Sequence, residues 1–321
     1  MILLQDVTKS YGAKKVLSNL SFQVKKGGVT GFLGANGAGK TTTMDILCGC
    51  RGFDTGSVEI DGVDILRNPL EARRKLGYLP DVPPLHPQLR VRESLNFAEK
   101  VLRKSWSGLE NRVDEVLELL GLETVQKQLV GTLSKGFRQR LGLAQAIIHR
   151  PELIVLDEPA EGLDPAQLQE LRLLIRNLGK ESTVFLSSHL LGEVQAVCDE
   201  LVIINRGQVI AQGGLKELSE SLARRRVVHL RIRKDIAKFV NEVSSMKQVV
   251  DSTLICLEKG EVRLTVENEN SEAIVDQVVQ KAVNGSYGLC ALEPQESLEE
   301  VFLNYTRADV NQAEAGSQPA V

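Results

Sequence analysis

Long apolar runs, clustered cysteines and a strong excess of one charge sign are all absent from this 321-residue sequence. No uninterrupted apolar stretch reaches about 18 residues, so no transmembrane helix is expected. The opening segment, MILLQDVTKSYG, has neither a basic region nor a long apolar one, which argues against a signal peptide. We therefore expect a cytoplasmic location.

The few cysteines are scattered, and an odd, unclustered set is typical of reduced thiols rather than a disulfide framework. The net charge of −3, from 39 basic and 42 acidic residues, provides no overall attraction to nucleic acid or anionic lipid. No nucleic-acid partner is therefore expected. The basic run Arg224–Arg226 is interpreted as a solvated linker, with contact to lipid headgroups or nucleic acid as the alternative.

A glycine-rich stretch, GANGAGKTTT, follows the short apolar strand expected at Val29–Leu33. Glycines allow successive backbone N–H groups to point at one anion, and the start of the helix that follows adds partial positive charge. The spacing Gly34-x-x-x-x-Gly39-Lys40-Thr41 matches the phosphate-loop pattern. Lys40 supplies a charge for the β- and γ-phosphates, and the Thr41 hydroxyl can bind Mg²⁺.

Strands and helices alternate over the first two thirds of the chain. Leu153–Leu156 is apolar without polar alternation, and Val184–Leu186 and Leu201–Ile204 repeat that pattern, which is typical of strands buried in a parallel sheet. Helical spacing occurs at Val113–Leu120 and Leu141–Ile148. The order predicts an α/β fold with a mostly parallel sheet.

The pattern changes near residues 219–226. Strand, helix, strand, strand, helix and strand are expected in turn over about 226–293, which is the order of a ferredoxin-like α+β domain. A last helix is expected from Ser297, followed by a tail without bulky apolar residues. The expected divisions are a main domain at 1–220 with a helical subdomain at about 85–150, an accessory α+β domain at 226–305, and a disordered tail at 306–321.

Two adjacent carboxylates, Asp157 and Glu158, directly follow the apolar run Leu153–Leu156. Parallel sheets bind ligands at the carboxyl ends of their strands. Asp157 can hold Mg²⁺ through water, and Glu158 can polarise a water for attack on a γ-phosphate. A solvated turn would explain the pair alone, but the phosphate loop favours the catalytic interpretation.

A third element is LSKGFRQR, residues 133–140. Ser134 can cap a helix that begins near Lys135, and Gly136 keeps the first helical turn open. This predicts a second anion site, with an ordinary capped helix as the alternative.

Together these motifs resemble the ATP-binding subunit of an ATP-binding-cassette (ABC) transporter. LIVLDEP resembles its Walker B motif and LSKGFRQR its signature, in the family's order. GANGAGKTT resembles its Walker A motif, which places ATP against Gly34, Ala35, Asn36, Gly37, Ala38, Gly39, Lys40, Thr41 and Thr42. The resemblance spans about residues 1–215 and implies a P-loop ATPase fold with a mostly parallel sheet, an antiparallel β subdomain and a helical subdomain.

The resemblance also implies roles for three further residues. Asp164 lies in GLDP, which resembles the D-loop. His189 falls where the family has a histidine that contacts the γ-phosphate, although a structural histidine is the alternative. Tyr11 matches the aromatic that stacks on adenine, with simple packing as the alternative.

Two positions depart from the family pattern. Asp81 occupies the position of the Q-loop glutamine; a carboxylate can bind Mg²⁺, so we expect Asp81 beside Thr41 and Asp157 as a metal ligand, with a plain turn residue as the alternative. The signature reads LSKGF where LSGGQ is common, and Lys135 adds positive charge able to help hold phosphate. Such variants, and the closing SLEEVFLNYT, are similar to bacterial export ATPases encoded apart from their permease.

One Walker A motif and one signature imply a head-to-tail dimer, homo- or heteromeric, in which each signature covers the ATP held by the other subunit. ATP and Mg²⁺ would close the dimer and hydrolysis would reopen it. A separate membrane permease would dock near residues 85–150 and hold the protein at the inner face of the membrane.

Three other functions remain as alternatives. A non-transport ABC ATPase would act on ribosomes or DNA, but such proteins usually carry two cassettes, a long coiled coil or zinc cysteines. An importer subunit would show a closer match to LSGGQ. A purely regulatory module would have an inactive ATPase site. The intact set Lys40, Asp157 and Glu158 argues against that alternative.

Overall fold

The computed structural model describes residues 1–102, 112–215, 217–218, 225–246, 249–256, 261–267 and 271–295. The chain divides into two compact units, Met1–Leu215 and Lys216–Val321. The helix expected from Ser297 and the tail at 306–321 lie outside the described residues. Within the described ranges, no helix combines the length and the apolar character needed to cross a membrane.

Six strands form the central sheet of the first unit, in the order β10-β9-β3-β8-β7-β6. All neighbouring pairs are parallel except β9 with β10. β3, β7 and β8 are buried along their whole length, which explains why their sequences lack polar alternation. The strands are β3 (Val29–Leu33), β6 (Leu76–Leu79), β7 (Leu153–Leu156), β8 (Thr183–Ser188), β9 (Glu200–Asn205) and β10 (Gln208–Gly214). The predicted parallel sheet is confirmed.

A second, antiparallel sheet in the order β2-β1-β4-β5 shares a hydrophobic core with the central sheet and with helix α1. The rings of Phe22, Phe32 and Phe185 join the two sheets, with centroids 5.3–5.7 Å apart. Burial of one face of α1 in this core fixes the start of that helix beside the end of β3. The elements are β1 (Ile2–Tyr11), β2 (Lys14–Val24), α1 (Lys40–Leu47), β4 (Thr55–Ile60) and β5 (Val63–Asp64).

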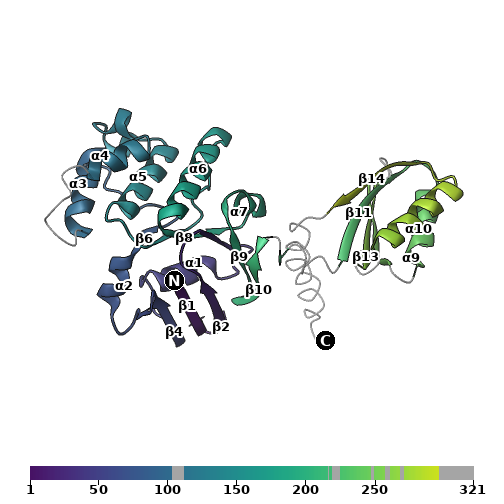
Figure 1. Ribbon diagram of the computed structural model, residues 1–321, viewed down its shortest axis with the longest axis horizontal. Helices are drawn as coiled ribbons and strands as arrows, with labels where there is room; N and C mark the ends of the chain where they lie inside the picture. The colour runs from purple at the N-terminus through teal and green to yellow at the C-terminus, as the bar shows by residue number, and fades with distance from the viewer. Residues whose placement is uncertain are drawn as a thin grey trace, which may run out of the picture. The chain divides into compact units, whose positions relative to one another are not determined.

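The remaining helices of this unit include three that gather away from the antiparallel sheet, α3, α4 and α5 (Figure 1). α5 approaches β6 closely at Gly142, where an added Cβ would lie 2.7 Å from the Leu79 Cδ1 atom. The helices are α2 (Pro69–Lys75), α3 (Val91–Leu102), α4 (Arg112–Leu119), α5 (Lys135–Ile147), α6 (Pro165–Glu181) and α7 (Leu191–Val197), with 3-10 turns at Glu123–Val125 and Val130–Thr132.

The second unit contains an antiparallel sheet in the order β12-β13-β11-β14, with α9 and α10 on one face of it (Figure 1). The chain order is βαββαβ, so the ferredoxin-like arrangement is observed. Alternate residues of the strands, such as Val228 and Leu230, meet Phe239 and Val278 of the helices in a separate core. The elements are β11 (Arg225–Ile232), α9 (Ile236–Ser244), β12 (Val249–Cys256), β13 (Glu261–Glu267), α10 (Ser271–Asn284) and β14 (Leu289–Gln295).

Candidate active site

Four neighbouring strands of the central sheet place the predicted site residues at one edge. The phosphate loop, residues 34–40, follows β3; Glu158 follows β7; His189 follows β8; and Asp81 comes shortly after β6. Because β3, β8, β7 and β6 are adjacent and parallel, their carboxyl ends lie side by side. Residues distant in the sequence are therefore neighbours at this edge.

The phosphate loop is built from glycines that no larger residue can replace without strain. Gly39 has a φ of 108°, and a Cβ there would lie 2.6 Å from the Leu17 Cδ2 atom. Lys40 is 6% exposed, and its Nζ donates to the carbonyl oxygens of Gly34 at 2.9 Å and Ala35 at 3.4 Å. No side chain caps the start of α1, so its first backbone N–H groups remain available to an anion.

The other predicted loop residues differ in exposure. Asn36 and Gly37 are exposed, Ala35 and Thr42 are half-buried, Ala38 is buried, and Thr41 is exposed at the first turn of α1. The exposed residues therefore form the outer wall of the loop, and the buried ones anchor it to the core.

Glu158 lies between a lysine and a histidine. Its Oε1 is 3.3 Å from Lys40 Nζ, and its Oε2 is 2.9 Å from His189 Nδ1. The backbone of Glu158 has a φ of 45°, an uncommon conformation for a non-glycine residue, and its N–H donates to Ser187 Oγ at 2.9 Å. The predicted catalytic pair Glu158 and His189 is thus brought into contact at the phosphate loop.

Asp157 is a buried carboxylate, 1% exposed, that accepts a hydrogen bond from Ser187 Oγ at 2.5 Å. Burial raises the pKa of Asp157, and the nearby Glu158 and Asp81 carboxylates raise it further. Hydrogen bonds from Ser187 and Thr41 act in the opposite direction. Thr41 and Asp81 are therefore both close enough to Asp157 to influence its carboxylate.

This arrangement fits a magnesium ion. A divalent cation would relieve the repulsion between the buried Asp157 carboxylate and its acidic neighbours, and the Thr41 hydroxyl adds a hard oxygen ligand. Among the described residues, no group of three or more His, Cys, Asp or Glu side chains could hold a metal ion. Mg²⁺ is usually bound by one or two carboxylates together with substrate phosphates. We propose Thr41, Asp81 and Asp157 as its protein ligands.

Asp157→Asn is expected to stabilise the nucleotide-free protein at neutral and alkaline pH. Because the folded state raises the pKa of Asp157, its ionised form costs stability, and this cost appears as the pH rises from the usual aspartate range through the raised pKa. Asparagine keeps the shape without the charge. The melting temperature of the variant should exceed that of the parent at pH 8, and the difference should shrink towards pH 4. An unchanged difference across this range would contradict the prediction.

The signature and D-loop residues cap two neighbouring helices. Ser134 Oγ accepts from the Phe137 N–H at 3.3 Å and so begins α5 as predicted. Asp164 accepts from the N–H groups of Ala166 and Gln167 at 3.0 and 2.9 Å and so begins α6.

Lys135 and Gly136 form the first turn of α5 and lie against the D-loop side of the chain. A Cβ added at Gly162 would be 2.4 Å from Lys135 Nζ, and one at Gly136 would be 2.7 Å from Gln167 Oε1. Within one copy of the chain, the charge of Lys135 therefore faces the D-loop. Its predicted contact with phosphate stays a prediction.

Tyr11, at the end of β1, is 40% exposed, so its ring surface remains partly open to a ligand. Lys9 Nζ and the Arg51 guanidinium carbon each lie 5.5 Å from the ring centroid. Arg51 is held by Asp45 of α1, with 3.1 Å between Nε and Oδ2. Adenine stacking on Tyr11 stays a prediction.

Sequence reasoning missed two residues of this site. Ser187 holds both acidic residues in place, because its hydroxyl donates to the Asp157 carboxylate and accepts from the Glu158 backbone N–H. Its signal was the polar pair Ser187-Ser188 at the end of an apolar strand, directly before His189. Arg51, which contacts the Tyr11 ring, had no recognisable signal because the contact depends on where β1 ends.

Comparison with known proteins places these features in a family. The model of the ABC transporter family matches residues 17–161. The bacitracin transport ATP-binding protein BcrA of Bacillus licheniformis is 42% identical over 216 residues, covering 66% of this chain and 69% of that protein. The linearmycin resistance ATP-binding protein LnrL of Bacillus subtilis is 32% identical over 308 residues, covering 95% of this chain and 98% of that protein. The Nod factor export ATP-binding protein I of Burkholderia orbicola is 33% identical over 306 residues, covering 94% and 95%.

The fold leads to the same family. A dimeric ATP-binding cassette solved in a post-hydrolysis state with ADP and Pi aligns with a TM-score of 0.62 at 25% identity, covering 67% of this chain and 99% of that chain. The phosphate loop, its lysine and the paired carboxylates of the present chain supply the groups that phosphoryl transfer requires. The chain therefore belongs to the ATP-binding proteins of ABC transporters, and it is an ATPase.

Proposed function

We propose that this ATPase powers a separate membrane permease for export, through closure of a dimer on ATP. The observation that carries the proposal is the Glu158 carboxylate, placed between Lys40 and His189 at the phosphate loop. The direction of transport is supported by the likeness over nearly the whole chain to a protein named for Nod factor export.

Each residue of the site has a distinct role in the proposed reaction. Lys40 contacts the β- and γ-phosphates, and Glu158 orients a water and accepts its proton. His189 holds Glu158 through the contact at 2.9 Å and would contact the γ-phosphate of bound ATP. Thr41, Asp81 and Asp157 would hold Mg²⁺, which when bound would supply positive charge to the reaction.

A head-to-tail dimer, homo- or heteromeric, completes the site. The chain carries one phosphate loop and one signature, and Ser134 stands at the exposed start of α5 with a hydroxyl and helix N-terminus suited to an anion. A solved cassette of the same fold is dimeric. We infer that Ser134, Lys135 and Gly136 contact the ATP bound to the partner subunit, with Asp164 of the D-loop beside it.

The helical region offers an apolar docking surface for the permease. Phe97 and Val101 lie one turn apart on α3 and are 53% and 65% exposed, and Val82 in the proline-rich segment is 78% exposed. The Phe97 ring meets His86 of that segment edge-on, with centroids 5.9 Å apart. Val82 directly follows Asp81, so the surface is continuous in sequence with the proposed magnesium site.

Phe97→Glu is expected to reduce recovery of the permease when the complex is purified through this chain. A carboxylate in an apolar contact loses the burial energy of the ring and must be desolvated, which together cost about 2–4 kcal/mol. Val283→Glu on α10 places the same carboxylate at another exposed apolar side chain, 63% exposed, and as the control should leave recovery unchanged. Equal recovery with both variants would exclude this surface.

The two units support the proposed division into an ATP-binding domain at 1–220, with its helical subdomain at about 85–150, and an accessory domain at 226–305. Each of two compact units has strands packed around a hydrophobic core. We place the chain at the cytoplasmic face of the membrane, held there by the permease.

A further inference from the structure

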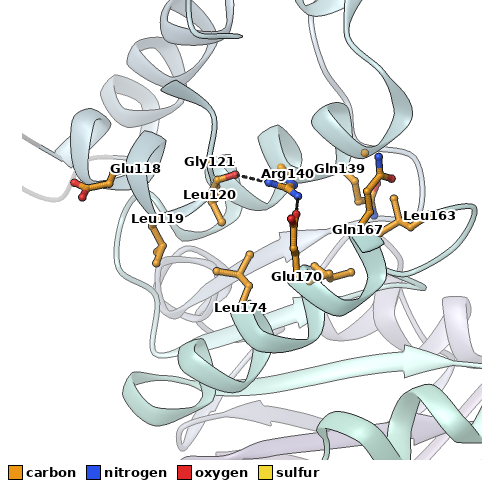
Figure 2. A pocket seen from close by; sticks show the side chains of 12 residues that line it. Glu118, Leu119, Leu120, Gly121, Gln139, Arg140, Leu163, Gln167, Glu170 and Leu174 are labelled. Atoms are coloured by element: carbon orange, nitrogen blue, oxygen red, sulfur yellow. Dashed lines mark hydrogen bonds and ion pairs between the residues drawn. The ribbon is translucent and has the colours of Figure 1, made fainter. Parts of the chain in front are cut away.

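A cavity of about 320 Å³ separates the end of α4 from α5 and α6 (Figure 2). Leucine side chains make up much of its wall and leave the space between them unfilled. They are Leu119, Leu120, Leu163, Leu171 and Leu174. α5 lines this space with Gly136, Gln139 and Arg140 rather than with large apolar side chains, so apolar packing between α5 and α6 contributes little at this place.

One arginine crosses the region instead. Arg140 of α5 forms an ion pair with Glu170 of α6, and its Nη1 donates to the Leu120 carbonyl oxygen just beyond α4 at 3.4 Å, as Figure 2 shows. Gly121, with a φ of 62°, makes room for the guanidinium: an added Cβ would lie 3.1 Å from Nη1. A single rigid group therefore connects α5, α6 and the turn that follows α4.

The Arg140–Glu170 pair continues a line of contacts between α5 and α6, called the seam below, that begins at the signature. Lys135 lies against Gly162 of the D-loop, and Gly136 lies against Gln167 in the first turn of α6. Arg140 and Glu170 are the next pair along the same two helices. The start of α5, capped by Ser134, is thus aligned with the start of α6 along this seam.

We propose that Arg140 is a positioning residue that sets the signature helix against the D-loop helix, so that Ser134 reaches the ATP of the partner subunit in the correct register. The proposal rests on the dimer described above. Arg140 and Glu170 have side chains 26% and 62% exposed, and ion pairs of this exposure add little to folding stability. Their effect is therefore expected on geometry, to which a site shared between two subunits is sensitive.

The test uses the full chain carrying Glu158→Gln, in which ATP is not turned over. Adding Arg140→Ala should leave ATP binding to the monomer within about twofold, because the phosphate loop is untouched, but weaken the ATP-dependent dimer about tenfold to a hundredfold. Calorimetry measures ATP binding to the monomer, and analytical ultracentrifugation measures the affinity of the ATP-dependent dimer. In the chain with Glu158 intact, Arg140→Ala should lower kcat without raising KM for ATP.

Two further variants separate positioning from a general loss of structure. The charge reversal Arg140→Glu with Glu170→Arg keeps the ion pair but loses the donor to the Leu120 carbonyl oxygen, so it should restore part of the dimer. Arg92→Ala removes an arginine that pairs with Asp114 within the helical region, away from α6, and should dimerise like the parent.

The outcomes are distinct. Equal dimerisation with and without Arg140 overturns the positioning role while leaving the proposed function intact. Weaker ATP binding together with a lower melting temperature, not restored by the charge reversal, also overturns it, because the arginine would then be only structural. Failure of the Glu158→Gln parent itself to dimerise with ATP contradicts the proposed dimer, and the positioning role with it.

Discussion

Glu158→Gln is expected to lower the rate of ATP hydrolysis by about a hundredfold to ten-thousandfold, because the amide cannot accept the proton of the attacking water. The same change should tighten ATP binding. In the nucleotide-free chain the Glu158 carboxylate lies 3.3 Å from Lys40 Nζ and so competes with phosphate for that cation. Glutamine removes the competing charge and leaves the shape of the site unchanged.

The variant should therefore accumulate as an ATP-bound dimer. Steady-state phosphate release measures the rate of hydrolysis, and calorimetry measures the affinity for ATP. Sedimentation with ATP and Mg²⁺ measures the dimer. Glu152→Gln is a matched control at the opposite end of β7, where the glutamate is 3.6 Å from Lys26 in a surface ion pair. Unchanged hydrolysis in Glu158→Gln would remove this residue from the mechanism.

Lys40→Ala is expected to weaken ATP binding about tenfold to a hundredfold, the loss associated with one or two charge-assisted hydrogen bonds to phosphate. Lys40 is 6% exposed and is positioned by the Gly34 carbonyl oxygen at 2.9 Å, so no other described cation of the loop can take its place. Hydrolysis should fall at least as steeply, because the cation also stabilises charge that develops on the γ-phosphate.

Calorimetry with a slowly hydrolysed ATP analogue tests this prediction, with Lys180→Ala at the exposed end of α6 as the control lysine. The double variant adds a sharper test of the competition between Glu158 and phosphate. If Glu158→Gln tightens ATP binding by releasing Lys40, the gain should vanish once Lys40 is alanine. A gain of the same size in both backgrounds would show that the ion pair does not limit nucleotide binding, and equal ATP affinity in Lys40→Ala would contradict the role of the lysine.

Much of this molecule could be predicted because its chemistry is local in the chain. The phosphate loop needs glycines before a helix, and the chain supplies them directly after an apolar strand. The buried strands carry uninterrupted apolar residues, and Ser134 precedes its helix as a cap must. The order of strands and helices in the second unit could likewise be recognised from short periodic segments.

The contacts between residues of the site could not be predicted from the sequence, because the tertiary structure sets them. Glu158 contacts Lys40 and His189 because β3, β8 and β7 are successive neighbours in the sheet. Strand order cannot be predicted from any local sequence pattern. Ser187 and Arg140 became visible only through contacts with residues about 30 positions away. The physical reason is that a hydrogen bond or ion pair requires two groups within a few ångströms, while periodicity along the chain specifies only the shape of each segment and the face that it buries.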